Sequence, residues 1–295
     1  MSFFFQLLST LFLFQTTSVI AHPPQLQHHH PAKYQSSSNG TASPVRNHGK
    51  RGLSYNDATL TAPFSLEGQH SHVSWAYNYY SYPYTVGQDQ SGYNKALDFV
   101  PQLWSTAPDL TSVWDSNVKA SVADYRTEAV LAFNEPDLCG DGGSCMNLSA
   151  VVTGYQKWMN PLAGTLRLGS PAVTNGLGPS IGLNFLKKFL QQCPDCQVDF
   201  IAIHWYGDAA NSSDFENHVR QAYRVGGRRP IWVTEFGTTS GTAAQTETFL
   251  KTTMKWMASS PMVERFAWFM DKPGNLINAN GTGLSDLGRI YNSGV

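Results

Sequence analysis

The sequence predicts an α/β fold, a single (β/α)8 TIM barrel, and two observations carry this prediction. Eight short apolar runs alternate along the chain with helical or loop stretches, which is typical of a parallel sheet covered by helices. The region Gly52–Val295 also has the length of one such barrel, roughly 250 residues. An open doubly wound sheet is the competing fold, but no glycine-rich phosphate turn follows the first run.

The eight runs are predicted to be buried parallel strands, because they are too short and too β-branched for helices. In chain order they are Gly52–Tyr55, His72–Tyr77, Leu97–Leu103, Ala129–Phe133, Leu166–Pro171, Val198–Ile203, Pro230–Val233 and Arg265–Phe269. Between them we expect helices over Asp57–Ser65, Trp114–Val122, Leu148–Ala163, Ile181–Gln192, Phe215–Val225 and Thr242–Ser259. The interval Tyr79–Asp98 is rich in Tyr, Gly and Gln, and it is predicted to be mostly loop.

The N-terminal residues are predicted to lie outside the barrel. Residues 3–14 form an apolar stretch too short to span a bilayer, and Val19-Ile20-Ala21 offers small residues to signal peptidase. Residues 1–21 are therefore expected to be the signal peptide of a secreted protein. Residues 22–51, rich in His, Pro, Ser, Gln and Asn, cannot bury enough apolar surface to fold. This disordered pro-segment ends in the dibasic pair Lys50-Arg51, where we expect removal that leaves residues 52–295.

The charge balance excludes one class of partner. Without Lys33, Arg46, Lys50 and Arg51, 16 basic residues face 21 acidic ones, a net charge of about −5 with no basic run. A nucleic-acid partner is therefore not expected, and no later apolar run approaches membrane-spanning length. We expect a monomer that lies outside the cell or in the cell wall.

The four cysteines fall into two close pairs, Cys139 with Cys145 and Cys193 with Cys196. In a secreted chain the first interpretation is two local disulfides that pin loops. A zinc site is the alternative, but it would need all four to converge, and only the second pair has ligand-like spacing. Glycosylation acceptors of the Asn-x-Ser/Thr type stand in expected surface loops at Asn147, Asn211 and Asn280.

Two glutamates end apolar runs at corresponding places, Glu135 after the fourth predicted strand and Glu235 after the seventh. Barrel active sites lie at the C-terminal ends of the strands, so the two carboxyl groups are expected to face each other across a cleft. One acid that protonates the leaving oxygen and one carboxylate that attacks the sugar suffice for hydrolysing a glycosidic bond. Asn-Glu-Pro alone is explained by a strand-to-helix turn, but burying two matched charges is costly unless they are paired or used.

We assign Glu135 as the general acid/base, with a raised pKa, and Glu235 as the nucleophile. The nucleophile must stay ionised, held by donors such as Asn134, Tyr206 or His204. Asn134 is also placed to bond the sugar 2-hydroxyl, although a backbone-capping role is an alternative. His204 is expected to orient a carboxylate or a sugar hydroxyl, since the sequence shows no partners for a metal.

Other polar and aromatic residues gather at the same predicted rim. Flat apolar faces suit the C–H faces of a pyranose ring, so side chains at strand ends are expected to bind the sugar. The predicted substrate-binding residues are Trp75, Tyr77, Asn78, Trp104, Asn134, His204, Trp205, Tyr206, Phe236 and Trp268. Neither a metal nor an organic cofactor is expected.

Six motifs stand at the predicted strands. They are Gly52-Leu-Ser-Tyr-Asn, Ser74-Trp-Ala-Tyr-Asn, Phe99-Val-Pro-Gln-Leu-Trp, Phe133-Asn-Glu-Pro-Asp, His204-Trp-Tyr-Gly and Trp232-Val-Thr-Glu-Phe-Gly. Together they resemble glycoside hydrolase family 128, the fungal group of alkali-sensitive linkage protein-like glycosyl hydrolases. The resemblance covers essentially all of residues 52–295. It implies a (β/α)8 barrel of a retaining clan, with Glu135 as acid/base, Glu235 as nucleophile and aromatic strand ends as subsites.

The same resemblance implies endo-acting cleavage of β-1,3-glucan, the glucan of fungal cell walls. Two alternatives stay open. The same mechanism would also serve a β-1,6-glucan, a β-1,4-glucan or a mannan, and a wall-associated lectin would use the aromatic cleft without catalysis. Loss of a carboxylate would favour the lectin, and both are present. A metal-dependent polysaccharide oxidase is disfavoured because processing leaves no N-terminal histidine and no His cluster.

Overall fold

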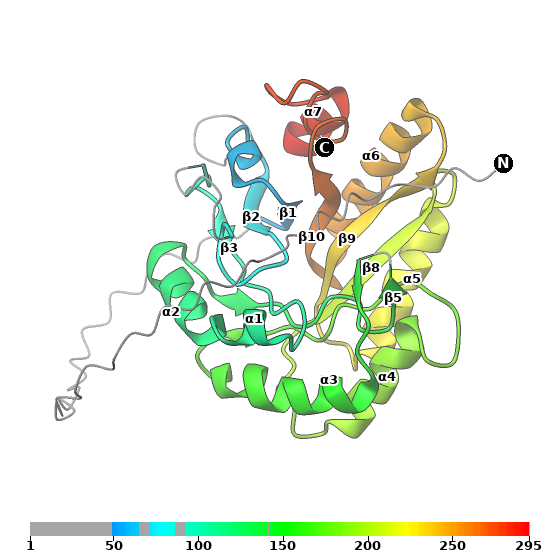
Figure 1. The fold of residues 1–295 in the computed structure, drawn as a ribbon. Helices are drawn as coiled ribbons and strands as arrows, with labels where there is room; N and C mark the ends of the chain where they lie inside the picture. Colours follow the sequence, from blue (N-terminus) through cyan, green and yellow to red (C-terminus); the bar gives the residue numbers. More distant parts are fainter. Residues whose placement is uncertain (1–48, 65–70, 86–91, 141, 295) are drawn as a thin grey trace, which may run out of the picture. The chain divides into compact units, whose positions relative to one another are not determined.

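Parallel strands form the centre of this computed structural model, which describes residues 49–64, 71–85, 92–140 and 142–294. The main sheet has the order β3-β2-β1-β10-β9-β8, and all neighbours in it are parallel (Figure 1). Its strands are β1 (Arg51–Tyr55), β2 (Val73–Tyr77), β3 (Asp98–Phe99), β8 (Ile201–Asp208), β9 (Ile231–Ser240) and β10 (Val263–Asp271).

Two further strands close the sheet into a barrel. β4 (Ala129–Val130) pairs in parallel with β7 (Arg167–Leu168). Parallel bridges join this pair to β3 on one side and to β8 on the other, between Gln102 and Leu131, Gly169 and Phe200, and Val173 and Ile203. The ring therefore has eight parallel positions in chain order, each overlapping one of the predicted runs, and β8, β9 and β10 extend several residues beyond theirs. The predicted (β/α)8 fold is confirmed.

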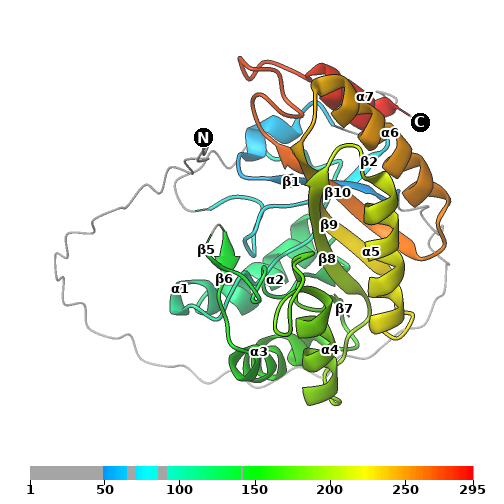
Figure 2. The ribbon, with the colours of Figure 1, turned by 90° about the vertical axis from the view of Figure 1, so that its right-hand side faces the viewer.

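Helices cover the outside of the barrel; α5 packs against β8 and β9, and α6 packs against β10 and beside α5 (Figure 2). The α-helices are α1 (Pro108–Thr111), α2 (Trp114–Asp124), α3 (Leu148–Gly154), α4 (Gly182–Gln192), α5 (Ser212–Val225), α6 (Ala243–Ser259) and α7 (Asp286–Ser293). A π-helical turn η2 (Tyr155–Met159) and a 3-10 turn η3 (Asn160–Leu162) continue α3.

The helix predicted over Asp57–Ser65 is reduced to a 3-10 turn, η1 (Ala58–Thr61), in the part of it that the structure describes. Pro63 follows directly and disfavours continuation of a helix. Helices α1 and α7 were not predicted, because α1 is a single turn and α7 follows a loop rich in Gly and Asn.

Local signals set the start of the longest helix, α6. The Thr242 side chain accepts from the Gln245 N–H at 3.2 Å, and the Gln245 side chain accepts from the Thr242 N–H at 2.8 Å. This reciprocal capping satisfies two backbone donors that a helix end leaves free. No helix among the described residues is long and apolar enough to cross a membrane.

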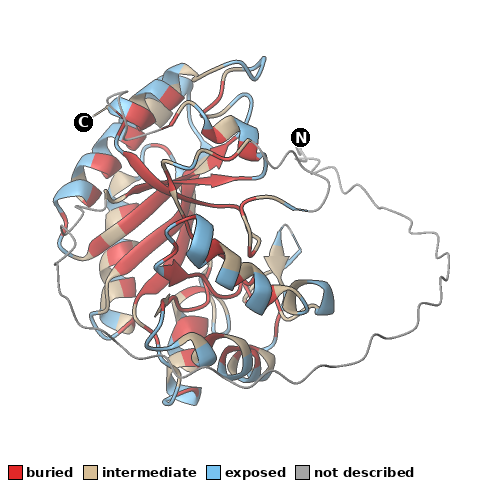
Figure 3. Cartoon of the chain, turned by 90° about the vertical axis from the view of Figure 1, so that its left-hand side faces the viewer, coloured by how far each residue is buried: buried red, intermediate tan, exposed pale blue. Residues whose placement is uncertain are grey.

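Two apolar layers hold the fold together, one inside the barrel and one between the strands and the helices. Trp75, Phe200 and Trp232 fill the barrel, and Phe200 stacks on Trp232 with ring centroids 3.9 Å apart. The outer layer packs residues such as Trp205 and Phe249 under the helices. Figure 3 shows the result, with buried strands at the centre and exposed surface on the helices.

The ordered domain begins before the predicted boundary at Gly52. Arg51 is already the first residue of β1 and is buried; its guanidinium donates to the carbonyl oxygens of Tyr291 and of Gly294, the latter at 3.0 Å. Lys50 donates through Nζ to Ser260 O at 2.8 Å. The dibasic pair thus belongs to the fold, so the disorder predicted for residues 22–51 does not reach Lys50 and Arg51. The predicted signal peptide, residues 1–21, and residues 22–48 of the predicted pro-segment lie outside the described residues.

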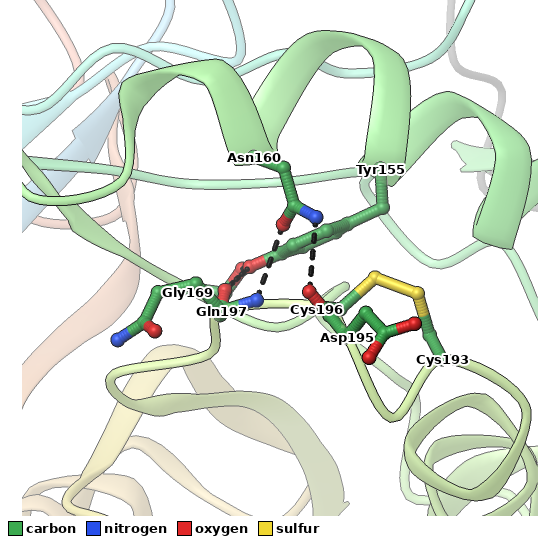
Figure 4. The surroundings of a disulfide bond; sticks show 7 residues. All are labelled: Tyr155, Asn160, Gly169, Cys193, Asp195, Cys196 and Gln197. Atoms are coloured by element: carbon green, nitrogen blue, oxygen red, sulfur yellow. Dashed lines mark hydrogen bonds between the residues drawn. A yellow bond between two sulfur atoms is a disulfide. The ribbon is translucent and has the colours of Figure 1, made fainter.

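The cysteines form the two local disulfides, Cys139–Cys145 and Cys193–Cys196, so the zinc alternative is wrong. The first bond ties a small hairpin, β5 (Cys139–Gly140) and β6 (Gly143–Ser144), which directly follows Glu135 in the chain. The second ends α4, beside Asn160, whose side chain bonds Asp195 O and the N–H of Gln197, each at 3.1 Å (Figure 4). The three sequon asparagines are all exposed, and glycosylation stays a prediction.

Candidate active site

The two predicted carboxylates lie at the C-terminal ends of the fourth and seventh strand positions of the barrel, with β7 and β8 between them. Glu135 follows β4, and its N–H donates to Ala172 O at 2.8 Å, which ties it to the next strand position. Its backbone has a φ of +42°, a left-handed conformation that a non-glycine residue adopts only when its surroundings impose it. Glu235 lies within β9, where it pairs with His204 of β8.

His204 brings the two carboxylates together. Its Nδ1 lies 2.7 Å from Glu135 Oε1 and 3.3 Å from Glu235 Oε2. The ligand atoms of all three residues lie within 4.8 Å of one another. Glu135 and Glu235 are 7% and 5% exposed and His204 is fully buried, so the cluster sits in a site with little access to water.

The charges of this cluster shift its protonation equilibria. Burial alone would lower the pKa of His204, but the charges of Glu235 and Glu135 outweigh it and raise that pKa. Burial raises the pKa of Glu235, opposed by His204 and reinforced by Glu135, while the hydrogen bond from Tyr206 lowers it. The pKa of Glu235 is therefore raised, whereas its predicted role as nucleophile favours the ionised form.

Tyr206 is one of the three donors predicted for Glu235, with Asn134 and His204. Its hydroxyl donates to Glu235 Oε2 at 2.5 Å. Asn175 holds the backbone of Tyr206 from both sides: its Nδ2 donates to Tyr206 O at 2.9 Å, and its Oδ1 accepts from the Tyr206 N–H at 3.2 Å. Burial raises the pKa of the Tyr206 phenol well above its usual value, so this group remains a donor.

The two predicted asparagines bond the loops that frame the site. The Asn134 side chain donates to Gly142 O at 3.1 Å, and its backbone carbonyl accepts from the Ser144 N–H at 2.9 Å. Asn134 therefore holds the disulfide-tied hairpin in place. Asn78 donates to Tyr82 O at 2.9 Å and shapes the turn after β2. Asn134 lies beside Glu135, and a contact with the sugar 2-hydroxyl stays a prediction.

For most of the aromatic residues predicted to bind the sugar, the prediction is wrong, because their side chains are buried. Successive residues of a strand point to opposite faces. Because His204 and Glu235 point inward, Trp205 and Phe236 point outward and pack under the helices, as does Trp268 of β10. All three are at most 2% exposed.

Two more aromatic residues that were predicted to bind the sugar point into the barrel, but they lie too deep in it to contact a substrate. Trp75 and Tyr77 are fully buried inside the barrel. Tyr77 donates its hydroxyl to Thr234 O at 2.9 Å, next to Glu235. Among the predicted aromatic residues, Trp104 and Tyr206 are the two that retain partial exposure.

Three residues around the site were missed. Tyr79 is partly exposed, and its ring packs edge-on against Tyr77, whose hydroxyl bonds Thr234 O next to Glu235. Asn175 holds Tyr206, and Asp137 accepts from the Thr174 hydroxyl at 2.7 Å and from the Gly182 N–H at 2.7 Å. All three lie in loops after strands. Loops lack the alternation of apolar and polar residues that indicates, within a strand, which way a side chain points. Asp137 alone had a signal, since it belongs to the Asn-Glu-Pro-Asp motif.

Glu135, His204 and Glu235 also have the side chains of a possible metal site. Within the described ranges, they are the group of His, Cys, Asp and Glu residues whose ligand atoms lie close enough to hold a metal ion. No partners for a metal-binding His204 are evident along the sequence, and the structure brings two carboxylates to it. His204 Nδ1, however, already makes a 2.7 Å hydrogen bond with Glu135, so a cation would have to displace that contact.

A parallel eight-stranded barrel that brings two glutamates together at the C-terminal ends of its strands has the arrangement of a glycoside hydrolase that uses two carboxyl groups. The glycosyl hydrolase catalytic core family model matches residues 52–291. The chain belongs to this family and is a glycoside hydrolase, and its resemblance to family 128 is confirmed by the solved structures that it matches.

One of these structures is a family 128 (subgroup III) curdlan-specific exo-β-1,3-glucanase from Blastomyces gilchristii in complex with glucose. It is 37% identical, covers 83% of this chain and 99% of its own, and has a TM-score of 0.71. Another is a variant of a subgroup I endo-β-1,3-glucanase from Amycolatopsis mediterranei with laminaritriose and laminaribiose. It is 26% identical, with coverages of 82% and 98% and a TM-score of 0.63.

A further relative is the alkali-sensitive linkage protein 1 of Schizosaccharomyces pombe, 30% identical over 264 residues. The alignment covers 82% of this chain and 44% of the relative. The chain thus spans less than half the length of this protein.

Proposed function

We propose that this protein is a secreted, retaining glycoside hydrolase that cleaves β-1,3-glucan by double displacement. Glu135 protonates the glycosidic oxygen while Glu235 attacks the anomeric carbon and forms a glycosyl ester. Glu135 then takes a proton from the water that attacks this ester. The attack frees Glu235 and leaves the anomeric carbon of the product with its original configuration.

The observation that carries this mechanism is the closeness of the two carboxylates. One oxygen of Glu135 and one of Glu235 lie within 4.8 Å of each other. Retaining enzymes hold their carboxyl groups about 5–5.5 Å apart, whereas inverting enzymes need about 6.5–9.5 Å to admit a water. An approach of two carboxylate oxygens this close supports the shorter, retaining arrangement, in which Glu235 attacks the sugar directly.

The substrate follows from the relatives. The fungal relative at 37% identity and the bacterial one at 26% both act on β-1,3-glucan, and the latter was captured with laminari-oligosaccharides. The first is exo-acting and the second endo-acting, so the endo mode predicted from the sequence has the support of one of the two. Secretion is supported by the two disulfides, which persist in oxidising compartments, and by the apolar N-terminal stretch.

The first experiment incubates the purified enzyme with linear β-1,3-glucan, β-1,6-glucan, β-1,4-glucan and mannan, and sizes the products. We expect hydrolysis of the β-1,3-glucan, with a ladder of oligosaccharides for endo action or glucose alone for exo action. Binding of β-1,3-glucan without any product would instead support the lectin alternative.

A second experiment tests the two carboxylates. Glu235→Ala is expected to lower kcat by at least about 10⁴-fold while leaving polysaccharide binding intact. Glu135→Ala should keep activity on aryl glycosides with good leaving groups, where azide rescues the second step. Glu216→Gln, which changes a partly exposed carboxylate of α5 paired with Arg220, is the matched control and should act like the wild type. Substantial hydrolysis by Glu235→Ala, or inverted product seen by NMR, would refute the mechanism.

A further inference from the structure

The loop after the fifth strand position, residues 174–182, is fastened to the loop that carries Glu135. Asp137, two residues after Glu135, accepts from the Thr174 hydroxyl and from the Gly182 N–H, each at 2.7 Å. One carboxylate therefore ties both ends of the loop. Gly182 has a φ of +58°, and a Cβ there would lie 2.2 Å from a backbone oxygen of the same loop, so glycine is required for the ends to close on each other.

Asn175 extends from this loop to the backbone of Tyr206 in β8. Its Nδ2 donates to Tyr206 O at 2.9 Å, and its Oδ1 accepts from the Tyr206 N–H at 3.2 Å. Just before, backbone pairing joins the same two strands, because the His204 N–H donates to Val173 O at 2.9 Å. The Asn175 amide thus continues the pairing two residues further along β8, in place of a backbone group.

Tyr206 connects this contact to the nucleophile. Its hydroxyl donates to Glu235 Oε2 at 2.5 Å, and its ring packs edge-on against Phe269 with centroids 5.6 Å apart. A hydrogen bond weakens steeply when its distance or angle departs from the optimum. The strength of this bond therefore depends on where the Tyr206 backbone is held, and Asn175 is the side chain that bonds it on both sides.

The protonation of Glu235 depends on the groups that face it. Its Oε2 lies 3.3 Å from His204 Nδ1, and an oxygen of Glu135 lies within 4.8 Å. Burial and Glu135 raise the pKa of Glu235, whereas His204 and the hydrogen bond from Tyr206 lower it. Burial raises the pKa of two phenols on the β2 side well above the usual value, which keeps them neutral: Tyr77 and Tyr79. The Tyr206 bond therefore favours the ionised form that the attack on the sugar requires.

We propose that Asn175 is a positioning residue for the nucleophile: its amide fixes the backbone of Tyr206, so that the Tyr206 hydroxyl orients Glu235 and keeps it ionised. The proposal rests on the assignment of Glu235 as nucleophile, and it deepens the proposed function. Because Asp137 anchors the loop of Asn175 beside Glu135, one loop supports the surroundings of both carboxylates.

The test is Asn175→Ala, which removes both bonds to Tyr206 and leaves the phenol in place. A weaker hydrogen bond to the charged form of Glu235 should move the acid limb of the kcat/KM profile to higher pH by about half a unit or more. Below the midpoint kcat/KM should fall about 3-fold or more, and less above it, with kcat affected more than KM. An acid limb that stays in place would overturn the proposal.

The matched control is Asn160→Ala. Asn160 binds a backbone segment in the same manner, since its side chain donates to Asp195 O and accepts from the Gln197 N–H, each at 3.1 Å (Figure 4). It precedes β7, at the end of the strands opposite to the site, whereas Asn175 follows the same strand position. Asn160→Ala should lower Tm and leave the pH profile unmoved. An equal shift in both variants would show that the effect of Asn175→Ala is only structural.

A double-variant cycle tests whether Asn175 acts through the phenol. Tyr206→Phe removes the hydroxyl and keeps the backbone that Asn175 binds, and it should move the acid limb upward by about one pH unit. In this background, Asn175→Ala should add less than half of the shift that it causes in the wild type. Equal shifts in the two backgrounds would show that Asn175 does not act through the Tyr206 hydroxyl.

A last measurement needs no substrate. The carboxyl carbon of Glu235 is titrated by NMR in protein labelled with ¹³C-glutamate, and its signal is assigned as the one missing from Glu235→Gln. The midpoint should be higher in Asn175→Ala than in the wild type and in Asn160→Ala. Equal midpoints would contradict the proposal. If the wild type hydrolyses no glucan, the proposed function fails, and this titration still decides the role of Asn175.

Discussion

At the scale of single residues, the site is a histidine shared by two carboxylates. His204 contacts Glu135 and Glu235 at once, and its buried position removes water as a competing partner. The residue types at the strand ends indicated this chemistry from the sequence. The sequence did not indicate that the histidine lies between the two acids.

The pH dependence of activity follows from these contacts. Because burial raises the pKa of Glu235, activity should fall on the acid side with a midpoint above the ordinary glutamate value of about 4.3. It should fall on the alkaline side above about 6.5, as His204, whose pKa is raised, loses the charge that faces both carboxylates. We expect a bell-shaped kcat/KM profile on β-1,3-glucan.

His204→Asn tests which group sets the acid side. The imidazolium charge lowers the pKa of Glu235, so the variant should move the acid limb to higher pH. An unchanged acid limb would show that His204 does not carry a charge in the active enzyme.

A second residue-scale prediction concerns Asp271 at the end of β10. It is 1% exposed, neither carboxyl oxygen has a hydrogen-bond partner, and burial raises its pKa well above the usual value. The folded protein therefore binds a proton here that the unfolded chain releases above about pH 4. Stability from this group falls as pH rises through that window, by about 1.4 kcal/mol per pH unit.

Asp271→Asn removes the ionisable group. The free energy of unfolding of this variant, relative to that of the wild type, should therefore increase as pH rises from about 4 towards 7. Urea unfolding at several pH values measures this difference. Asp286→Asn, an exposed acid in α7, is the control and should show no such divergence. A constant difference between Asp271→Asn and the wild type would show that Asp271 is ionised in the folded state.

At the scale of elements, the two disulfides have different neighbours. Cys139–Cys145 closes the hairpin that bonds Asn134, next to Glu135, whereas Cys193–Cys196 ends α4 away from the site. Their spacing along the chain predicted both pairs, but only the structure distinguishes their roles.

Replacing each pair by serines tests this distinction. Closed loops of this size stabilise by about 2 kcal/mol, so both double variants should lose a similar free energy of unfolding. The Cys139→Ser/Cys145→Ser enzyme should also lose about 10-fold in kcat, because the hairpin beside Glu135 is released. The Cys193→Ser/Cys196→Ser enzyme should keep its kcat. Equal kcat values would show that the hairpin does not position the acid.

At the scale of the whole molecule, the barrel closes where the two ends of the ordered chain meet. Lys50 O accepts from the Phe266 N–H at 2.8 Å and from Trp75 Nε1 at 3.1 Å, and Arg51 binds the C-terminal carbonyls of α7 and the residues after it. Residues just before Gly52 thus join β2, β10 and the last helix.

Cleavage after Arg51 would remove these bonds. A chain beginning at Gly52 should therefore melt about 10 °C below one beginning at Asn47, since five or so hydrogen bonds are lost at about 1 kcal/mol each. Differential scanning calorimetry of the two chains measures this. Equal Tm values would show that the predicted cleavage after Lys50-Arg51 does not change the stability of the fold.

The amino-acid pattern by itself determined the eight strands, their order, the two glutamates and the cysteine pairs. These features depend on local hydrophobic period, strand length and spacing, all of which can be seen along the chain. Which side of each strand faces the cleft was decided only in three dimensions. Trp205, Phe236 and Trp268 were wrongly placed in the cleft because a one-residue step reverses a side chain.

Tertiary structure also decided the contacts between distant segments. His204 meets Glu135 across 69 residues, and Tyr77 meets Thr234 across 157. Such contacts depend on the closure of the barrel, which brings strand ends together irrespective of their separation in the chain. Protonation equilibria depend on the same closure, because burial and charge at the site arise only when all eight strands are in place.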